Sequence, residues 1–321
     1  MLSLSALSRR LPTAFQQIKQ LSSYAVNDGA HLGDALATSG IDTVQLAYDK
    51  HEPPKKPEVE KSPLIFLHGL FGSKTNTRTV AKTLAQRLSR DVYCLDLRNF
   101  GQSPHSTRLD YPSLAADVER FIDEAELPRK PILVGHSMGA KAIMAVALRR
   151  PDIPEMIVSV DNAPVFIPST SGGKFSKYVK HLRQALEVDQ YTSIKDVDAE
   201  LAKVEPVKEI RQFLLTNVDR GQKDDICKSR IPLDIIDKAI VSGNIALWPY
   251  DPTLARWSRG PALFIRGTES KYVPDDVFQD IGQYFPNFEV RDVKAGHWLI
   301  SENPKEFMNV LCEFIERNED E

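Results

Sequence analysis

Short apolar runs and longer helix-forming stretches alternate along the first half of the chain. Four runs, at 64–67, 92–95, 131–134 and 156–160, contain no charged residue. Runs of this length are typical of strands buried on both faces, and their alternation with helical stretches is the βαβ pattern of a parallel sheet. A strand candidate at 43–48 precedes them, and further candidates start at Ala262 and Phe288. The pattern predicts an α/β protein with a mostly parallel central sheet flanked by helices.

The middle of the chain lacks this alternation. Between about 165 and 255 the apolar residues recur at helical spacing, and no strand candidate interrupts them. Amphipathic helix candidates cover 174–186, 194–204, 207–217 and 233–241. We interpret the segment as a helical cap, or lid, inserted into the sheet domain. The predicted organisation is a core in two parts, 40–164 and 256–321, with the cap at 165–255 between them.

The first 27 residues differ in composition from the rest of the chain. No acidic residue occurs before Asp28, whereas Arg9, Arg10 and Lys19 are basic. Apolar residues recur at steps of three and four and form one helical face: Leu4, Leu7, Leu11, Phe15 and Ile18. An acid-free, Arg-bearing segment is typical of a mitochondrial presequence, so we predict a presequence over 1–27 and a mitochondrial location. A secretory signal fits less well, because the two arginines interrupt the apolar region.

Composition narrows the class of protein. The chain has 321 residues, 42% of them hydrophobic, which is enough for one large core. The 41 Lys and Arg residues against 44 Asp and Glu residues leave no basic excess for a nucleic-acid partner. Cys94, Cys227 and Cys312 match no metal or redox spacing, so we expect neither a disulfide framework nor a metal site. No apolar stretch approaches the ~20 residues of a membrane-spanning helix.

The pentapeptide Gly135-His136-Ser137-Met138-Gly139 lies between an apolar run and a helix-forming stretch. A G-x-S-x-G sequence in that context is typical of a nucleophile elbow, a sharp strand-to-helix turn that exposes the serine hydroxyl. Glycine two positions to each side lets the strand and the helix pack closely. We therefore predict Ser137 as a catalytic nucleophile.

A serine nucleophile needs a base and an oxyanion hole. His297 follows the strand candidate at 288–293, which suits the Ser, acid, His chain order of hydrolases, so we predict it as the base. The glycine-rich loop after the run 64–67 is expected to supply one oxyanion donor, the backbone N–H of Leu70, and Met138 the other. We expect the His68 side chain to brace this loop and not to carry a proton.

The acid that orients the base has more than one candidate. Ser270 stands where such an acid is usually found, after the strand that starts at Ala262, and Glu269 is its neighbour. The preceding strand candidate, 156–160, ends in Asp161, whose carboxylate can also reach the imidazole. We favour Asp161 over Glu269, with Asp275 and Asp276 as further choices. A structural alternative is that Asp161 only caps the following turn.

Several of these segments together carry a resemblance to a known family. They are 68–73, 96–104, 135–139, 161–164 and 296–298. The set resembles the α/β-hydrolase subgroup of mitochondrial hydrolase-domain esterases, and within it most resembles the yeast ethanol acetyltransferases, over about residues 40–321. The resemblance implies an acid after the strand that here ends at Asp161. Phe100 departs from the pattern where many relatives have His, and Ala140 where many have a third Gly.

The resemblance also implies an activity. It points to an alcohol O-acetyltransferase that makes ethyl acetate from acetyl-CoA and ethanol through an acetyl-Ser137 intermediate, with esterase and thioesterase side activity. Acetyl-CoA is then a substrate, and no resident cofactor is expected; the partners are small molecules. The alternative is a mitochondrial carboxylesterase or thioesterase without a transferase role. A binding protein that has lost its chemistry is disfavoured, because Ser137 and His297 are both present.

Overall fold

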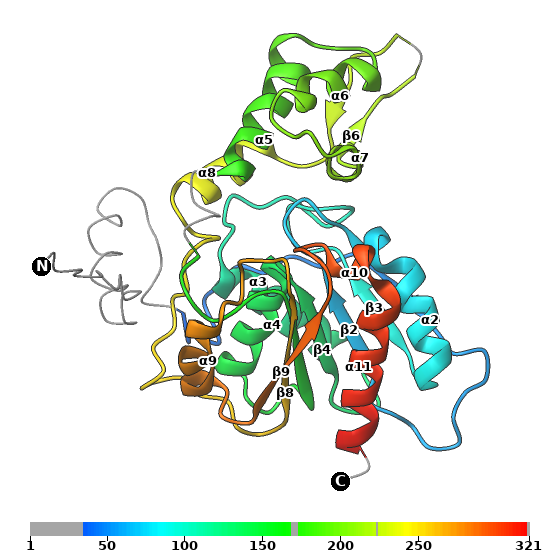
Figure 1. Cartoon of the computed structure of the whole chain (residues 1–321), viewed down its shortest axis with the longest axis vertical. Helices are drawn as coiled ribbons and strands as arrows, with labels where there is room; N and C mark the ends of the chain where they lie inside the picture. The colour runs from blue at the N-terminus through cyan, green and yellow to red at the C-terminus, as the bar shows by residue number, and fades with distance from the viewer. Residues whose placement is uncertain (1–34, 168–172, 223, 320–321) are drawn as a thin grey trace, which may run out of the picture.

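The computed structural model describes residues 35–167, 173–222 and 224–319. A seven-stranded sheet with the strand order β1-β3-β2-β4-β5-β8-β9 forms its centre (Figure 1). β1 pairs antiparallel with β3, and the other neighbours pair in parallel. The strands are β1 (Tyr48–His51), β2 (Leu64–Leu67), β3 (Val92–Leu95), β4 (Ile132–His136), β5 (Met156–Val160), β8 (Ala262–Gly267) and β9 (Phe288–Val293). The predicted mostly parallel sheet is confirmed.

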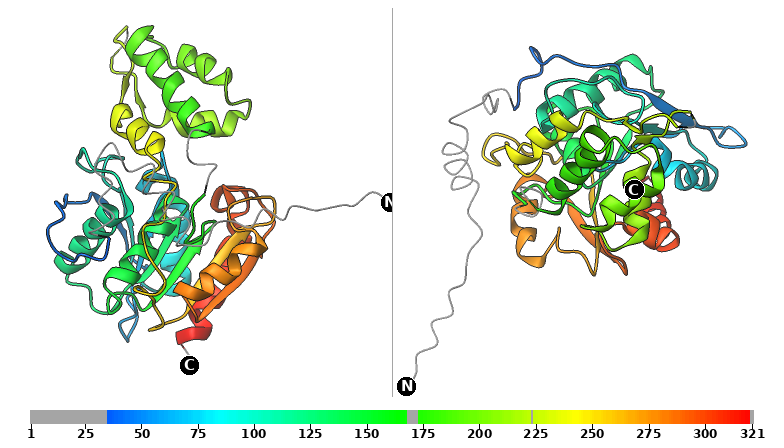
Figure 2. Two further views of the ribbon diagram at one scale, coloured as in Figure 1. Left: turned by 90° about the vertical axis from the view of Figure 1, so that its left-hand side faces the viewer. Right: turned by 90° about the horizontal axis from the view of Figure 1, so that it is seen from above.

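Helices cover both faces of this sheet, as Figures 1 and 2 show. On one face, α2 (Arg78–Leu88) and α11 (Pro304–Glu319) pack against Leu64 and Phe66 of β2. On the other face, α3 (Tyr111–Glu124), α4 (Met138–Arg149) and α9 (Phe278–Tyr284) contribute to the hydrophobic cluster that contains the intervening Ile65 and Leu67. Successive side chains of a strand point to opposite faces, so a strand that is covered by helices on both faces needs an apolar residue at every position. Shorter elements are η2 (Lys74–Thr77), η5 (Asp275–Val277) and α10 (Leu299–Glu302).

A helical lobe stands over the core between β5 and β8 (Figures 1 and 2). The four predicted helices are present as α5 (Lys174–Arg183), which continues into the π-helical turn η4 (Gln184–Val188), α6 (Ile194–Ala202), α7 (Lys208–Leu215) and α8 (Leu233–Val241). The expectation of no strand in this segment is wrong. β6 (Val218–Asp219) pairs antiparallel with β7 (Lys228–Ser229). Two-residue strands are too short to produce an alternating pattern in the sequence.

The cap is tied to the core through both of its connections. The side chain of Lys141, on α4, donates to the carbonyl of Val165 at 2.7 Å and to that of Ala246 at 3.0 Å. These two carbonyls lie at the start and near the end of the inserted segment. Burial lowers the pKa of Lys141 to about 7. Lys141 is 1% exposed, so a buried amino group connects the cap to the core.

The strand predicted at 43–48 is misplaced, because β1 begins only at Tyr48. Side chains occupy two of the backbone donors in the preceding residues. The N–H of Val44 donates to the carboxylate of Asp117 at 2.8 Å, and that of Ala47 donates to Ser103 Oγ at 2.9 Å. These donors are therefore not available to a neighbouring strand, and the ladder starts after them.

Two further expectations concern the cysteines and membrane-spanning helices. The three cysteines are buried and unpaired in the part of the chain that the structure describes. No helix within the described ranges combines the length and the apolar character that crossing a bilayer requires. The presequence predicted over 1–27 lies outside the described residues.

Candidate active site

Ser137 occupies the sharp turn between β4 and α4. Its backbone has φ 54° and ψ −114°, and non-glycine residues rarely adopt a positive φ. Close packing on both sides of the turn requires glycine. A Cβ at Gly135 would lie 2.2 Å from the carbonyl oxygen of Gly139, and a Cβ at Gly139 would lie 2.5 Å from that of Leu67. The strand, turn and helix expected of a nucleophile elbow are thus present.

The structure brings together three side chains that the sequence keeps far apart. Nδ1–H of His297 donates to Asp161 Oδ2 at 2.6 Å, and Ser137 Oγ lies 3.0 Å from His297 Nε2. His297 projects from the loop between β9 and α10, and Asp161 follows β5 directly. With Nδ1 protonated toward the carboxylate, Nε2 is free to accept the hydroxyl proton. This is the geometry that a serine nucleophile, a base and an orienting acid require.

Asp161 has further hydrogen-bond partners besides the imidazole of His297. Asp161 is fully buried, and its Oδ1 accepts the backbone N–H of Gly267 at 3.0 Å. Ser270, which stands where the acid is usually found, donates its hydroxyl to Asp161 Oδ2 at 2.5 Å. Glu269 is exposed, and Asp275 pairs with Arg266. Among the four candidate carboxylates, only that of Asp161 is bonded to His297 within the described residues.

Other residues hold the loop that carries His297. The ring of Tyr272 stacks on the imidazole, with 3.9 Å between ring centroids and 13° between planes. Glu302 accepts the backbone N–H of Gly296 at 2.6 Å and that of Trp298 at 3.3 Å. Sequence reasoning missed both Tyr272 and Glu302, because neither belongs to a motif with a recognisable spacing.

His136 supports the same loop from the elbow. Its Nε2–H donates to the backbone carbonyl of His297 at 2.8 Å. Burial, with the neighbouring His297 as a second cause, holds the pKa of His136 well below its usual value. The ring is therefore neutral near pH 7, and it adds no positive charge beside His297.

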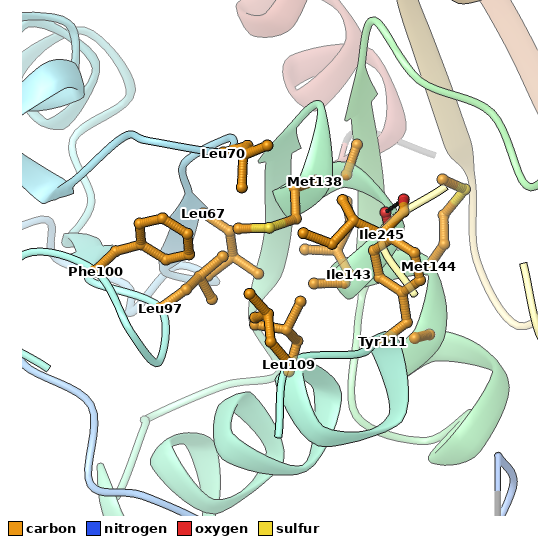
Figure 3. Close-up of a cluster of buried hydrophobic side chains, with 14 of the residues drawn as sticks. Leu67, Leu70, Leu97, Phe100, Leu109, Tyr111, Met138, Ile143, Met144 and Ile245 are labelled. Atoms are coloured by element: carbon orange, nitrogen blue, oxygen red, sulfur yellow. Dashed lines mark hydrogen bonds between the residues drawn. The ribbon is translucent and has the colours of Figure 1, made fainter. Parts of the chain in front are cut away.

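The loop with Leu70 lies beside the elbow. Nδ1–H of His68 donates to the carbonyl of Gly69 at 2.8 Å, and its Nε2 accepts the N–H of Leu97 at 3.0 Å. Burial lowers the pKa of His68, so the ring is neutral and braces the loop as expected. Figure 3 shows the side chains of Leu70 and Met138 entering one buried cluster. Within the described chain, neither of their backbone N–H groups donates to a protein acceptor.

A mainly apolar pocket of about 600 Å³ opens beside Ser137. Its walls come from both the core and the cap. α7 and the residue before it contribute Val207, Ile210 and Phe213, and the ring of Phe213 lies 4.7 Å from that of Trp298. The charged side chains of the described lining are Glu209 and Glu302, with no lysine or arginine among them. A concave apolar site of this size suits a small uncharged ligand.

The chain belongs to the α/β hydrolase fold family, which it matches over residues 62–304. Among curated relatives, it is 41% identical over 293 residues to a probable alcohol acetyltransferase of Saccharomyces cerevisiae, covering 86% of this chain and 85% of that protein. It is 33% identical to the sn-1-specific diacylglycerol lipase ABHD11 of Xenopus laevis, covering 87% and 86%. It is also 33% identical to ethanol acetyltransferase 1 of Wickerhamomyces ciferrii, covering 85% and 74%.

A solved structure of a marine microorganism esterase superposes with a TM-score of 0.74 at 30% identity, covering 85% of this chain and 100% of that one. The fold and family expected from the sequence are confirmed. The relatives support an enzyme with acyltransferase or hydrolase activity. Both activities act on acyl carbonyl groups, and small-molecule substrates fit the pocket described above.

Proposed function

We propose that this chain is a serine-dependent alcohol O-acetyltransferase that makes ethyl acetate from acetyl-CoA and ethanol. The observation that carries the assignment is the 41% identity to a probable alcohol acetyltransferase over 86% of this chain. The hydrogen-bonded series of Ser137, His297 and Asp161 supplies a nucleophile, a base and an orienting acid for acyl transfer. Esterase and thioesterase side activities follow, because water can attack the same acyl-enzyme.

Two half-reactions follow from this arrangement. Ser137 Oγ attacks the acetyl carbonyl carbon while its proton passes to Nε2 of His297, and the N–H groups of Leu70 and Met138 stabilise the oxyanion. The C–S bond then breaks, His297 returns the proton to the leaving sulfur, and the acetyl group stays on Ser137. Ethanol next gives its proton to His297 and attacks the acetyl carbon. The C–Oγ bond breaks, ethyl acetate leaves, and the proton returns to Ser137.

The charge of the pocket bears on how acetyl-CoA would bind. The lining carries the carboxylates of Glu209 and Glu302, which repel phosphate groups. We therefore expect the acetyl group and the uncharged arm that carries the thioester to enter the pocket. The phosphorylated nucleotide would remain outside it. No residue is assigned to the nucleotide.

The partition of the acetyl group between ethanol and water tests the proposal. Purified protein is incubated with acetyl-CoA and increasing ethanol, and free thiol, acetate and ethyl acetate are measured together. We expect ethyl acetate to rise at the expense of acetate. Water is the more abundant acceptor, so this result requires a site that orients ethanol far better than water. An unchanged acetate yield without ester at any ethanol concentration would contradict the transferase assignment.

The second candidate is a carboxylesterase or thioesterase without a transferase role. One relative carries the name of a lipase, and the solved structure at 30% identity is an esterase. The pocket of about 600 Å³ also has room for more than an acetyl group and ethanol. The partition experiment separates the two candidates, because this one predicts hydrolysis products alone.

We also propose that residues 1–27 direct the protein to mitochondria. Deleting them should leave activity in vitro within about twofold, because all residues assigned to the site lie in the fold that follows. The shortened protein should remain in the cytosol, as subcellular fractionation would show. An intact Met1 on protein isolated from mitochondria, or loss of activity in the purified deletion variant, would contradict a removable presequence.

A further inference from the structure

We propose that Asn217 of the cap is a positioning residue for the oxyanion hole. Its amide Nδ2–H donates to the backbone carbonyl of Phe71 at 2.8 Å, and Phe71 directly follows the oxyanion donor Leu70. The cap thus holds one end of the loop that provides this donor. The inference rests on the proposed serine mechanism, but it does not depend on acetyl-CoA or ethanol as the substrates.

The core and the cap hold different parts of the oxyanion loop, 68–72. A core contact holds its start, because Nε2 of His68 accepts the N–H of Leu97. Within the loop, the carbonyl of Gly69 accepts both Nδ1–H of His68 and the N–H of Gly72. The end of the loop has an unfavourable backbone conformation. Phe71 has a φ of 63°, which is uncommon for a bulky side chain, so surrounding contacts must stabilise it.

Three contacts on Phe71 come from the cap. Its carbonyl accepts the amide of Asn217, as described above. Its buried ring lies 6.1 Å from that of Phe175 and 6.4 Å from that of Tyr178, both on α5. Leu70 lies between the part held by the core and the part held by the cap. The N–H of Leu70 shares a peptide plane with the Gly69 carbonyl, which accepts the N–H of Gly72. Fixing Phe71, which precedes Gly72, therefore also restricts the direction of the Leu70 N–H.

Asn217 is itself rigidly placed within the cap. It is 5% exposed and follows α7, where its N–H donates to the carbonyl of Leu214 at 3.1 Å. Its own carbonyl accepts the N–H of Arg230 at 2.8 Å, just beyond β7. The short β6–β7 pair therefore sets the position from which the amide reaches the core. Full activity then requires the cap to be docked, because an undocked cap removes the amide from Phe71.

The substitution Asn217→Asp tests this role with little change of shape. A carboxylate cannot donate to the Phe71 carbonyl and repels it. With 4-nitrophenyl acetate as the substrate, we expect kcat to fall about 10- to 100-fold with KM nearly unchanged, less than the loss on deleting an oxyanion donor outright. The uncharged variant Asn217→Ala should also have a lower kcat. Thr216→Val is the matched control, because among the described residues the Thr216 hydroxyl bonds only to the carbonyl of Phe213, in the helix that it follows.

A tetrahedral adduct separates positioning from a merely structural role. A trifluoromethyl ketone that reacts with Ser137 places an oxyanion in the hole. In the Asn217 variants, its inhibition constant should therefore rise by the factor by which kcat/KM falls. A purely structural role would lower the melting temperature without this parallel. Folded Asn217 variants with the kcat of Thr216→Val, or with unchanged affinity for the ketone, would overturn the inference alone. A wild-type protein that neither hydrolyses the ester nor binds the ketone would overturn the proposed function together with it.

Discussion

Replacing Ser137 with alanine should abolish ester formation and hydrolysis together, with a loss on the order of 10⁵-fold or more in turnover. Both products descend from one acyl-enzyme, and without Oγ no acyl-enzyme forms. The fold should persist, because the side chain is small and the strained turn rests on backbone packing at Gly135 and Gly139. Parallel assays of thiol, acetate and ethyl acetate give the measurement.

Ser242→Ala is a suitable control for this experiment. Ser242 lies on the cap at the end of α8, where its hydroxyl bonds to the carbonyl of Ala239. The substitution Ser242→Ala also removes a serine hydroxyl oxygen, but at a distance from the pocket, so activity should stay near that of the wild type. A serine-directed fluorophosphonate should label the control and not Ser137→Ala. Acetyl transfer that survives in the folded Ser137 variant would show that ethanol attacks acetyl-CoA directly, and the covalent mechanism would be wrong.

Asp161→Asn should lower turnover by about 10⁴-fold. The amide can donate to the imidazole and so favours the wrong tautomer, in which Nε2 carries the proton and cannot accept that of Ser137. Burial makes this effect large, since no water can take over the role of the carboxylate. Rates of acyl-enzyme formation with a nitrophenyl ester give the measurement.

Glu269→Gln is the matched comparison for the acid. Glu269 is a carboxylate of the same candidate set, but it is exposed and lies beside the bonded Ser270. We expect most of the activity to remain in this variant. The opposite ranking in two folded variants would assign the acid to Glu269 and make the contact between Asp161 and His297 a structural one.

Local sequence information could not decide between the two main candidates for the acid. Both Asp161 and Glu269 follow strand candidates, and the sequence favoured the first without excluding the second. The geometry separates them, because Asp161 contacts His297 and Ser270 at once. Ser270 at the usual acid position was visible in the sequence. Its partner was not, since 109 positions separate it from Asp161.

Errors in the predicted elements have a similar cause. β6 and β7 are too short for a periodic pattern, and β1 starts late because side chains of Asp117 and Ser103 take up the preceding backbone donors. Helices α5 to α8 were predictable, because each carries an amphipathic repeat over at least two turns. Tyr272 and Glu302 contact His297 and its loop, but no spacing in the sequence predicts these contacts.

By itself, the sequence determined the parallel sheet, the elbow at Ser137 and the candidate base, because strand runs, helical periodicity and the glycines of a sharp turn are local properties. Only the tertiary structure decided which carboxylate meets His297 and how the cap contacts the oxyanion loop. These contacts join residues far apart in the chain, such as Asn217 and Phe71, which are 146 positions apart. Such pairs depend on the packing of whole elements against one another, and a single sequence carries no short-range signal for that packing.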